Sequence, residues 1–133
     1  MEKRFDPIQN KTADIIEYMM QSPDIPEDVS LNFKIRLCIE EAVENIVSYA
    51  YENGQGYVVV GTKIENNRLI LSFRDEGVPF NPLDKPDPDI TSSAEERPVG
   101  GLGIFICKQM MDKVTYVYEH HCNNLQMEMI LNK

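Results

Sequence analysis

The sequence lacks any apolar run long enough to cross a membrane. Nowhere in its 133 residues do about 18 consecutive apolar residues occur, the length that a membrane-spanning helix needs. The amino-terminal segment MEKRFDPIQNK has no apolar run behind its charges, so a secretory signal peptide is not indicated either. We therefore expect a protein that stays in the cytoplasm and does not act at a membrane.

Basic residues are also scarce. Thirteen Lys and Arg residues stand against 22 Asp and Glu residues, which gives a net charge of −9 and a sequence pI near 4.6. Such a charge opposes contact with nucleic-acid phosphates and with anionic lipid. Direct binding of nucleic acid is therefore not expected.

Cysteines are few and show no pairing pattern. Cys38, Cys107 and Cys122 are odd in number, widely spaced and free of any Cys-x-x-Cys motif. This argues against a disulfide framework and against a zinc site. A metal on His120, His121 and Cys122 would need a fourth donor that the sequence does not indicate. Cys38 and Cys107 are predicted to be small reduced apolar residues on helices.

The length suits one domain, and the pattern of apolar residues indicates its elements. A chain of this size buries one sizeable core. Helical spacing predicts a short helix within residues 8–20 and a long one from Ser30 to about Tyr51. The glycines before residue 104 open a third helical pattern. We therefore expect three helices in a single domain that covers residues 1–133.

Strand-like runs occur in two pairs. Residues 57–64 and 68–75 predict a hairpin with its turn at Asn66-Asn67, and residues 114–119 and 125–131 predict another around Asn123-Asn124. Between these pairs, residues 79–98 hold five of the eight prolines, so no regular element is expected there. This order predicts an α/β (α+β) two-layer sandwich, with a mixed, mostly antiparallel sheet and helices on one face.

The long helix places a carboxylate and an amide on one edge. Glu41 and Asn45 are one turn apart and lie to one side of the apolar stripe. Charged residues beside such a stripe are often only a solvated flank. The sharper hypothesis is that Glu41 acts as a general base and Asn45 supplies an oxygen ligand to Mg²⁺. The spacing alone leaves both open.

An acidic residue followed by a glycine ends the first hairpin. Asp75-x-Gly77 occurs in many plain turns, so an ordinary strand exit is one interpretation. The functional alternative is that Asp75 accepts a hydrogen bond from the exocyclic amine of a base. Gly77 would then let the backbone approach that ligand closely.

Three glycines stand at the start of the third helix. Gly100, Gly101, Leu102 and Gly103 combine uncrowded backbone amides with the positive end of a helix dipole, which suits a phosphate. The spacing fits neither the Rossmann fingerprint nor the P-loop. A helix start without a ligand is the alternative interpretation.

In this order, the three motifs resemble those of the histidine-kinase-like ATPases, which include sensor histidine kinases, DNA gyrase and heat-shock chaperone ATPases. The segments EEAVENIVSYAY, DEGVPFNP and ERPVGGLGIF are similar to the forms found in anti-sigma-factor serine kinases. The resemblance covers about residues 30–131. It implies the Bergerat-type ATP-binding fold, with ATP and Mg²⁺ as cofactors.

The resemblance also implies a role for each site residue. Asn45 would bind Mg²⁺, Asp75 would read the adenine amino group, and Glu41 would take the proton from an incoming serine hydroxyl. Residues 82–99 would form a lid over the triphosphate, with Arg97 assisting the amides near Gly101 and Gly103. Pro79-Phe80 replaces the second glycine that many histidine kinases show, which fits the anti-sigma branch.

The implied activity is that of an ATP-dependent serine/threonine kinase. It would phosphorylate or sequester a small regulatory protein of the anti-anti-sigma type, and a sigma factor is a second candidate partner. A non-catalytic nucleotide-binding module and an ATP hydrolase stay open as alternatives. Tyr49 stands where the family often has histidine, and Gln126 stands roughly where a threonine often meets phosphate. The partner's identity and the oligomeric state, a homodimer included, are left open.

Overall fold

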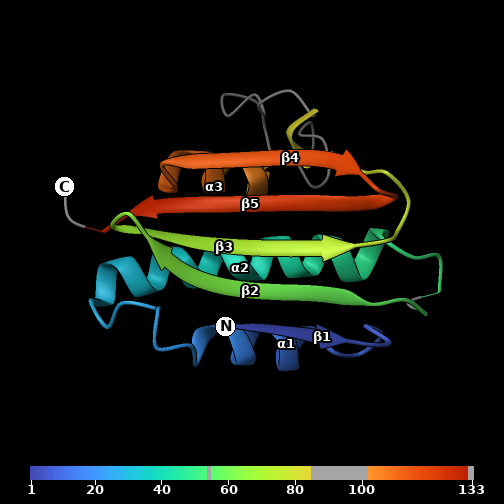
Figure 1. The fold of residues 1–133 in the computed structure, drawn as a ribbon, viewed down its shortest axis with the longest axis horizontal. Coiled ribbons are helices and arrows are strands. Elements are labelled where there is room, and N and C mark those ends of the chain that lie inside the picture. The colour runs from blue at the N-terminus through green and yellow to red at the C-terminus, as the bar shows by residue number, and fades with distance from the viewer. Residues whose placement is uncertain (54, 85–101, 132–133) are drawn as a thin grey trace.

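A five-stranded antiparallel sheet forms one layer of the protein. The computed structural model describes residues 1–53, 55–84 and 102–131. The strands are β1 (Glu2–Phe5), β2 (Val58–Glu65), β3 (Arg68–Asp75), β4 (Lys113–Glu119) and β5 (Cys122–Ile130). They lie in the order β1-β2-β3-β5-β4, and each neighbouring pair is antiparallel (Figure 1). The central position of β3 places Asp75 at one end of the middle of the sheet.

Helices form the second layer and cover one face of the sheet. They are α1 (Thr12–Met20), α2 (Val29–Tyr49) and α3 (Leu102–Met110), all on the same side (Figure 1). The long helix begins where Asp28 caps it, because the Asp28 side chain accepts a hydrogen bond of 3.0 Å from the Leu31 amide. The two-layer sandwich predicted from the sequence is therefore confirmed.

The core lies between the layers, as the apolar periodicity predicts. Side chains of a strand alternate between the two faces, so every second residue of β3 and β5 reaches the helices. The sheet contributes buried residues to this core from its three middle strands: Val58, Val60, Leu69, Leu71, Phe73, Leu125, Met127 and Met129. Helix α2 contributes the buried residues Ile35, Cys38, Ile39, Ala42 and Val43. Cys38 and Cys107 are free, buried residues on helices, as predicted.

Two local predictions were wrong, and one strand was not expected. Glu2–Phe5 forms a strand that the sequence pattern does not indicate, because only Phe5 of these four residues is buried and the pairing with β2 creates the strand. The last turn lies at His120 and His121, whose φ values are 55° and 64°, and not at Asn123-Asn124, which belong to β5. The proline-rich stretch does contain a regular element, a 3₁₀ helix at Pro82–Asp84.

The turn of the first hairpin agrees with the sequence pattern. Asn66 and Asn67 form the β2–β3 turn with φ values of 52° and 63°, in the left-handed region that asparagine tolerates. Among the described helices, none combines the length and the apolar character needed to cross a bilayer.

Candidate functional site

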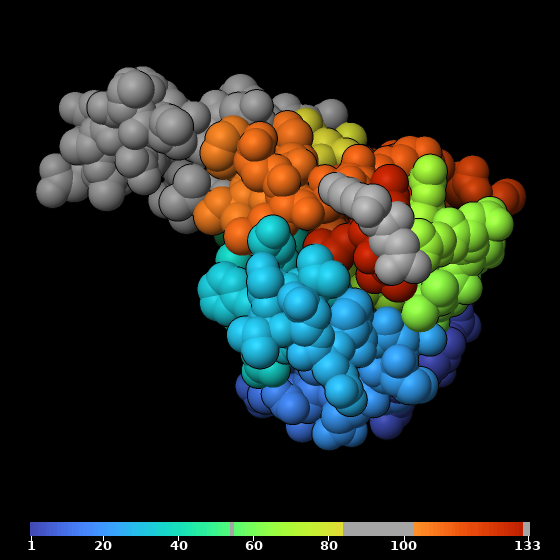
Figure 2. All heavy atoms as spheres, turned by 90° about the vertical axis from the view of Figure 1, so that its left-hand side faces the viewer, coloured from blue at the N-terminus to red at the C-terminus, as the bar shows by residue number. Residues whose placement is uncertain are grey.

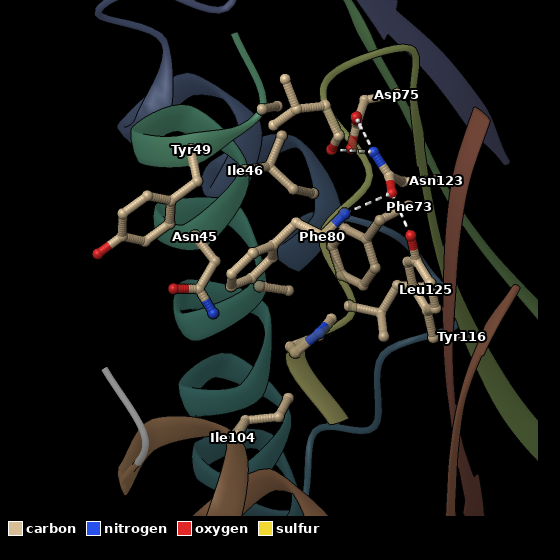
Figure 3. A pocket seen from close by; sticks show the side chains of 14 residues that line it. Asn45, Ile46, Tyr49, Phe73, Asp75, Phe80, Ile104, Tyr116, Asn123 and Leu125 are labelled. Atoms are coloured by element: carbon tan, nitrogen blue, oxygen red, sulfur yellow. Dashed lines mark hydrogen bonds between the residues drawn. The ribbon is translucent and has the colours of Figure 1, made fainter. Parts of the chain in front are cut away.

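A pocket opens between α2, the ends of β3 and β5, and the segment that leaves β3. Its walls include Asn45 and Tyr49 from α2, Asp75 from β3 and Asn123 from β5 (Figure 3). The Phe80 ring lies between α2 and the sheet in this view and stacks on Tyr49, with ring centroids 5.5 Å apart. The cavity left between these side chains is about 40 Å³. A ring-sized ligand would therefore need Phe80 or its neighbours to move.

Asp75 is buried at the inner end of this pocket. The residue is only 3% exposed, and its Oδ1 accepts hydrogen bonds from the Gly77 amide at 2.8 Å and from Asn123 Nδ2 at 2.9 Å. Burial raises the pKa of the Asp75 carboxyl, and the hydrogen bonds from Asn123 and Gly77 act in the opposite direction. None of the described residues donates a hydrogen bond to its second oxygen, Oδ2. A buried acceptor without a donor is costly, so this oxygen suits an amine donor on a ligand.

Asn123 is a site residue that the sequence analysis missed. It lies opposite Asp75 in the β3–β5 register and is 7% exposed. Its amide also donates to the Val78 carbonyl at 3.0 Å and, more weakly, to the Gly77 carbonyl at 3.3 Å. The signal was available, because the inward alternation of Leu125, Met127 and Met129 extends back to residue 123.

Gly77 is required by the fold. A Cβ on this residue would lie 2.1 Å from the carbonyl oxygen of Ala50, the residue that caps the end of α2. The next amide, that of Val78, donates to the same Ala50 oxygen at 2.9 Å. The absence of a side chain at Gly77 therefore lets the segment after Asp75 pack against the end of the long helix. Contact between Gly77 and a ligand stays a prediction.

Glu41, Asn45 and Gly103 form a second group, further along α2. Asn45 Nδ2 donates to Glu41 Oε1 at 3.3 Å, and a Cβ on Gly103 would lie 2.1 Å from Glu41 Oε2. Figure 2 shows α3, in orange, lying against α2, in cyan. The structure thus brings together three residues that were proposed from separate motifs. Glu41 is half-buried against α3 and is not a fully solvated flank residue.

The remaining predicted site residues are only partly described. Arg97, Gly100 and Gly101 lie outside the described residues, as does most of the predicted lid at 82–99. Leu102 is the first residue of α3. Gln126 is exposed and pairs with Ser72 and Thr115 in the sheet, so it faces away from the helices and the pocket. It therefore cannot take the place of a phosphate-binding threonine in this pocket.

Fold and site together define a class of protein. A helix-covered antiparallel sheet holds a buried carboxylate at the end of a strand, and a Glu-x-x-x-Asn pair on the long helix lies against the start of another helix. The family model described as "Histidine kinase-like ATPase domain" matches residues 10–129. The chain belongs to this family.

Curated relatives agree with this assignment. The chain is 31% identical over 83 residues to the "Anti-sigma F factor" of Bacillus licheniformis, a match that covers 62% of this chain and 57% of the relative. It is 32% identical over 89 residues to the "Serine-protein kinase RsbW" of Bacillus cereus (strain AH820), which covers 64% of this chain and 56% of the relative. The matches thus span somewhat more than half the length of these relatives.

The family implies the use of ATP and Mg²⁺, and the described residues fit both. Asp75 Oδ2 offers a buried acceptor for an amine. Asn45 Nδ2 donates a hydrogen bond to Glu41, and no described residue donates to Asn45 Oδ1. An amide oxygen of this kind is a ligand that Mg²⁺ prefers.

Proposed function

We propose that this protein is an ATP-dependent serine/threonine kinase of the anti-sigma-factor type. The observation that carries this proposal is the contact of Glu41 with Asn45 and with Gly103 of α3. Glu41 and Asn45 belong to α2, the helix that also lines the pocket of Asp75. This arrangement offers a base, a cation ligand and a helix start near one another. A buried acceptor at the far end of the pocket would fix the nucleotide.

At the base-binding end, Asp75 holds the adenine ring. Its Oδ2 accepts a hydrogen bond from the exocyclic amine, while Oδ1 stays bound to the Gly77 amide and Asn123. Phe80 and Tyr49 supply apolar ring surface at the same pocket. A wrong base would leave the buried carboxylate unpaired, which is the basis of strong discrimination.

At the phosphate end, the residues position the charge and move one proton. Mg²⁺-ATP supplies the transferable phosphoryl group when it is bound. Asn45 would hold the cation through its side-chain oxygen, and the amides at the start of α3 would face the phosphates. Glu41 would accept the proton of the incoming serine hydroxyl, and such a base typically contributes about 10²–10⁴-fold to the rate. Arg97, Gly100 and Gly101 are proposed to assist there.

The substrate is proposed to be a small regulatory protein of the anti-anti-sigma type, with a sigma factor as a second partner. The names of the relatives, an anti-sigma F factor and a serine-protein kinase, support this choice. We propose that residues 1–133 act as one domain in the cytoplasm, where ATP is available, with residues 82–99 as the lid. A homodimer is the oligomeric state to test first.

Label transfer from ATP with a radioactive γ-phosphate tests the proposal. The protein is incubated with Mg²⁺-ATP, with and without candidate partner proteins, and protein-bound and free phosphate are measured. Label on a serine or threonine of a partner supports the kinase. Free phosphate alone would indicate a hydrolase in which Glu41 activates water, and tight nucleotide binding with neither product would indicate a non-catalytic module.

A further inference from the structure

Asn123 makes every polar contact that its side chain can make. Its Nδ2 donates to Asp75 Oδ1 at 2.9 Å and to the Val78 carbonyl at 3.0 Å. Its Oδ1 accepts from the Phe80 amide at 3.1 Å and from the Tyr116 hydroxyl (Figure 3). The carbonyl of Val78 can only accept and the amide of Phe80 can only donate, so these partners fix the orientation of the Asn123 amide.

This orientation decides which oxygen of Asp75 is left for a ligand. Two donors, the Gly77 amide and Asn123 Nδ2, converge on Oδ1. The carboxylate is thereby held by one oxygen, and Oδ2 is the oxygen without a donor among the described residues. Asn123 comes from β5 and the Gly77 amide from the segment after β3, so two separate parts of the chain clamp the group.

We propose that Asn123 is a positioning residue that keeps Asp75 an oriented hydrogen-bond acceptor and so makes the pocket select adenine over six-oxo purines. This inference rests on the proposed function of Asp75. Inosine triphosphate is the sharpest probe, because it carries a carbonyl oxygen in place of the adenine amine. An acceptor at Asp75 would pair with the amine of ATP and oppose the oxygen of inosine triphosphate.

The substitution Asn123→Leu removes the donor and keeps nearly the same side-chain shape. Asp75 then keeps one donor on Oδ1, the Gly77 amide. The hydrogen bond from Asn123 opposes the rise that burial causes in the pKa of Asp75, so its loss favours the protonated carboxyl. Protonated Asp75 can donate from Oδ2, which suits inosine triphosphate and opposes ATP.

The other titratable groups that face this cluster do not reproduce such an effect. Tyr51 lies just after α2 and Tyr57 just before β2, and burial raises the pKa of both phenols, so they stay neutral in the test. Tyr116 of β4 is a third phenol. Glu76 accepts a hydrogen bond from the Tyr57 hydroxyl at 2.8 Å and is exposed. A change of nucleotide selectivity with pH would therefore report Asp75.

The experiment measures the affinity for Mg²⁺-ATP and for Mg²⁺-inosine triphosphate by calorimetry, from about pH 6 to about pH 9. It uses the parent, Asn123→Leu and the matched control Asn124→Leu. Asn124 is the next residue of β5, and its amide bonds to the Cys122 and Val117 carbonyls outside the pocket. Asp75→Asn serves as the reference for a pocket without the carboxylate.

The expected result is a loss of about 10- to 100-fold in ATP affinity for Asn123→Leu, with inosine triphosphate bound as well as or better than by the parent. The lost ATP affinity should return in part as the pH rises and Asp75 loses its proton. Asn124→Leu should keep the parental preference for ATP at each pH.

Two outcomes overturn the proposal. If Asp75→Asn changes the preference for ATP and Asn123→Leu does not, Asn123 has no positioning role. If Asn123→Leu does not fold, as judged by circular dichroism, Asn123→Ala takes its place and should lose ATP preference in the same direction; failure of both to fold would make Asn123 a purely structural residue. An unchanged preference in Asp75→Asn would instead contradict the proposed function of Asp75 itself.

Discussion

At the sheet end of the pocket, Asp75 and Asn123 are 3% and 7% exposed and are joined by a hydrogen bond of 2.9 Å. At the helix end, Glu41 and Asn45 are half-buried, and the hydrogen bond between them is 3.3 Å long. The first pair is fixed by the register of two neighbouring strands, because residues 75 and 123 are direct partners. The second depends on how closely α3 packs on α2.

Under the proposed function, this difference assigns base recognition to the sheet end and proton transfer to the helix end. A fully buried, multiply bonded group suits recognition, because any mismatch leaves a desolvated polar atom. A half-exposed carboxylate at a helix contact suits proton transfer, since a protein substrate must reach it. Substitutions at the two ends should therefore affect different steps.

The largest expected effect is at the helix end. Glu41→Ala should bind Mg²⁺-ATP nearly as well as the parent but transfer phosphate about 10²–10⁴-fold more slowly, the usual cost of removing a general base. Binding is measured by calorimetry and transfer by label on the partner, with both done on one preparation. Glu44→Ala is the control, because Glu44 is an exposed carboxylate on the same helix. Parental transfer by Glu41→Ala would make Glu41 a flank residue without a catalytic role.

The next effect is at the sheet end. Asp75→Asn should weaken ATP binding by about 10-fold or more, because an amide presents a donor where the adenine amine needs an acceptor. Calorimetry measures the affinity, and a thermal melt checks the fold. Glu76→Gln is the matched control, since Glu76 is the adjacent carboxylate and is exposed. Equal loss in both variants would show a general charge effect and would contradict base recognition by Asp75.

A pair of glycine substitutions sharpens the comparison with a smaller effect. In Gly77→Ala the new methyl would meet the backbone oxygen of Ala50 at 2.1 Å, which cannot move aside easily. We expect a loss of about 1–3 kcal/mol in the free energy of unfolding, as in other overpacked sites.

In Gly103→Ala the methyl would meet the end of the Glu41 side chain, which can rotate away. That variant should keep its stability and transfer phosphate more slowly, by less than Glu41→Ala does. Denaturant titration and label transfer measure the two effects, and the opposite pattern would contradict the assignment.

The sequence alone predicts those parts of the site that lie within one element. Glu41 and Asn45 follow from helix spacing, and Asp75 from its place at a strand end. The sequence assigns Asn123 to a turn, because Asn-Asn pairs favour turns. The alternation along β5 places residue 123 on the inward face but does not show that it faces Asp75 across β3 and β5. Strand β1 was missed for a related reason, since its three exposed residues become a strand only by pairing with β2. Both errors concern contacts that form only between distant segments.

The central claim is that this pocket binds a magnesium nucleotide with Asn45 as the protein ligand of the cation. Calorimetric titration of the parent protein with ATP, in the presence of Mg²⁺ and then of EDTA, tests it most directly. We predict clear binding of ATP that weakens when the metal is removed, because Asn45 would hold the cation that neutralises the charge of the phosphates. Equal affinity with Mg²⁺ and with EDTA would contradict the role of Asn45, and no binding in either condition would contradict the nucleotide site.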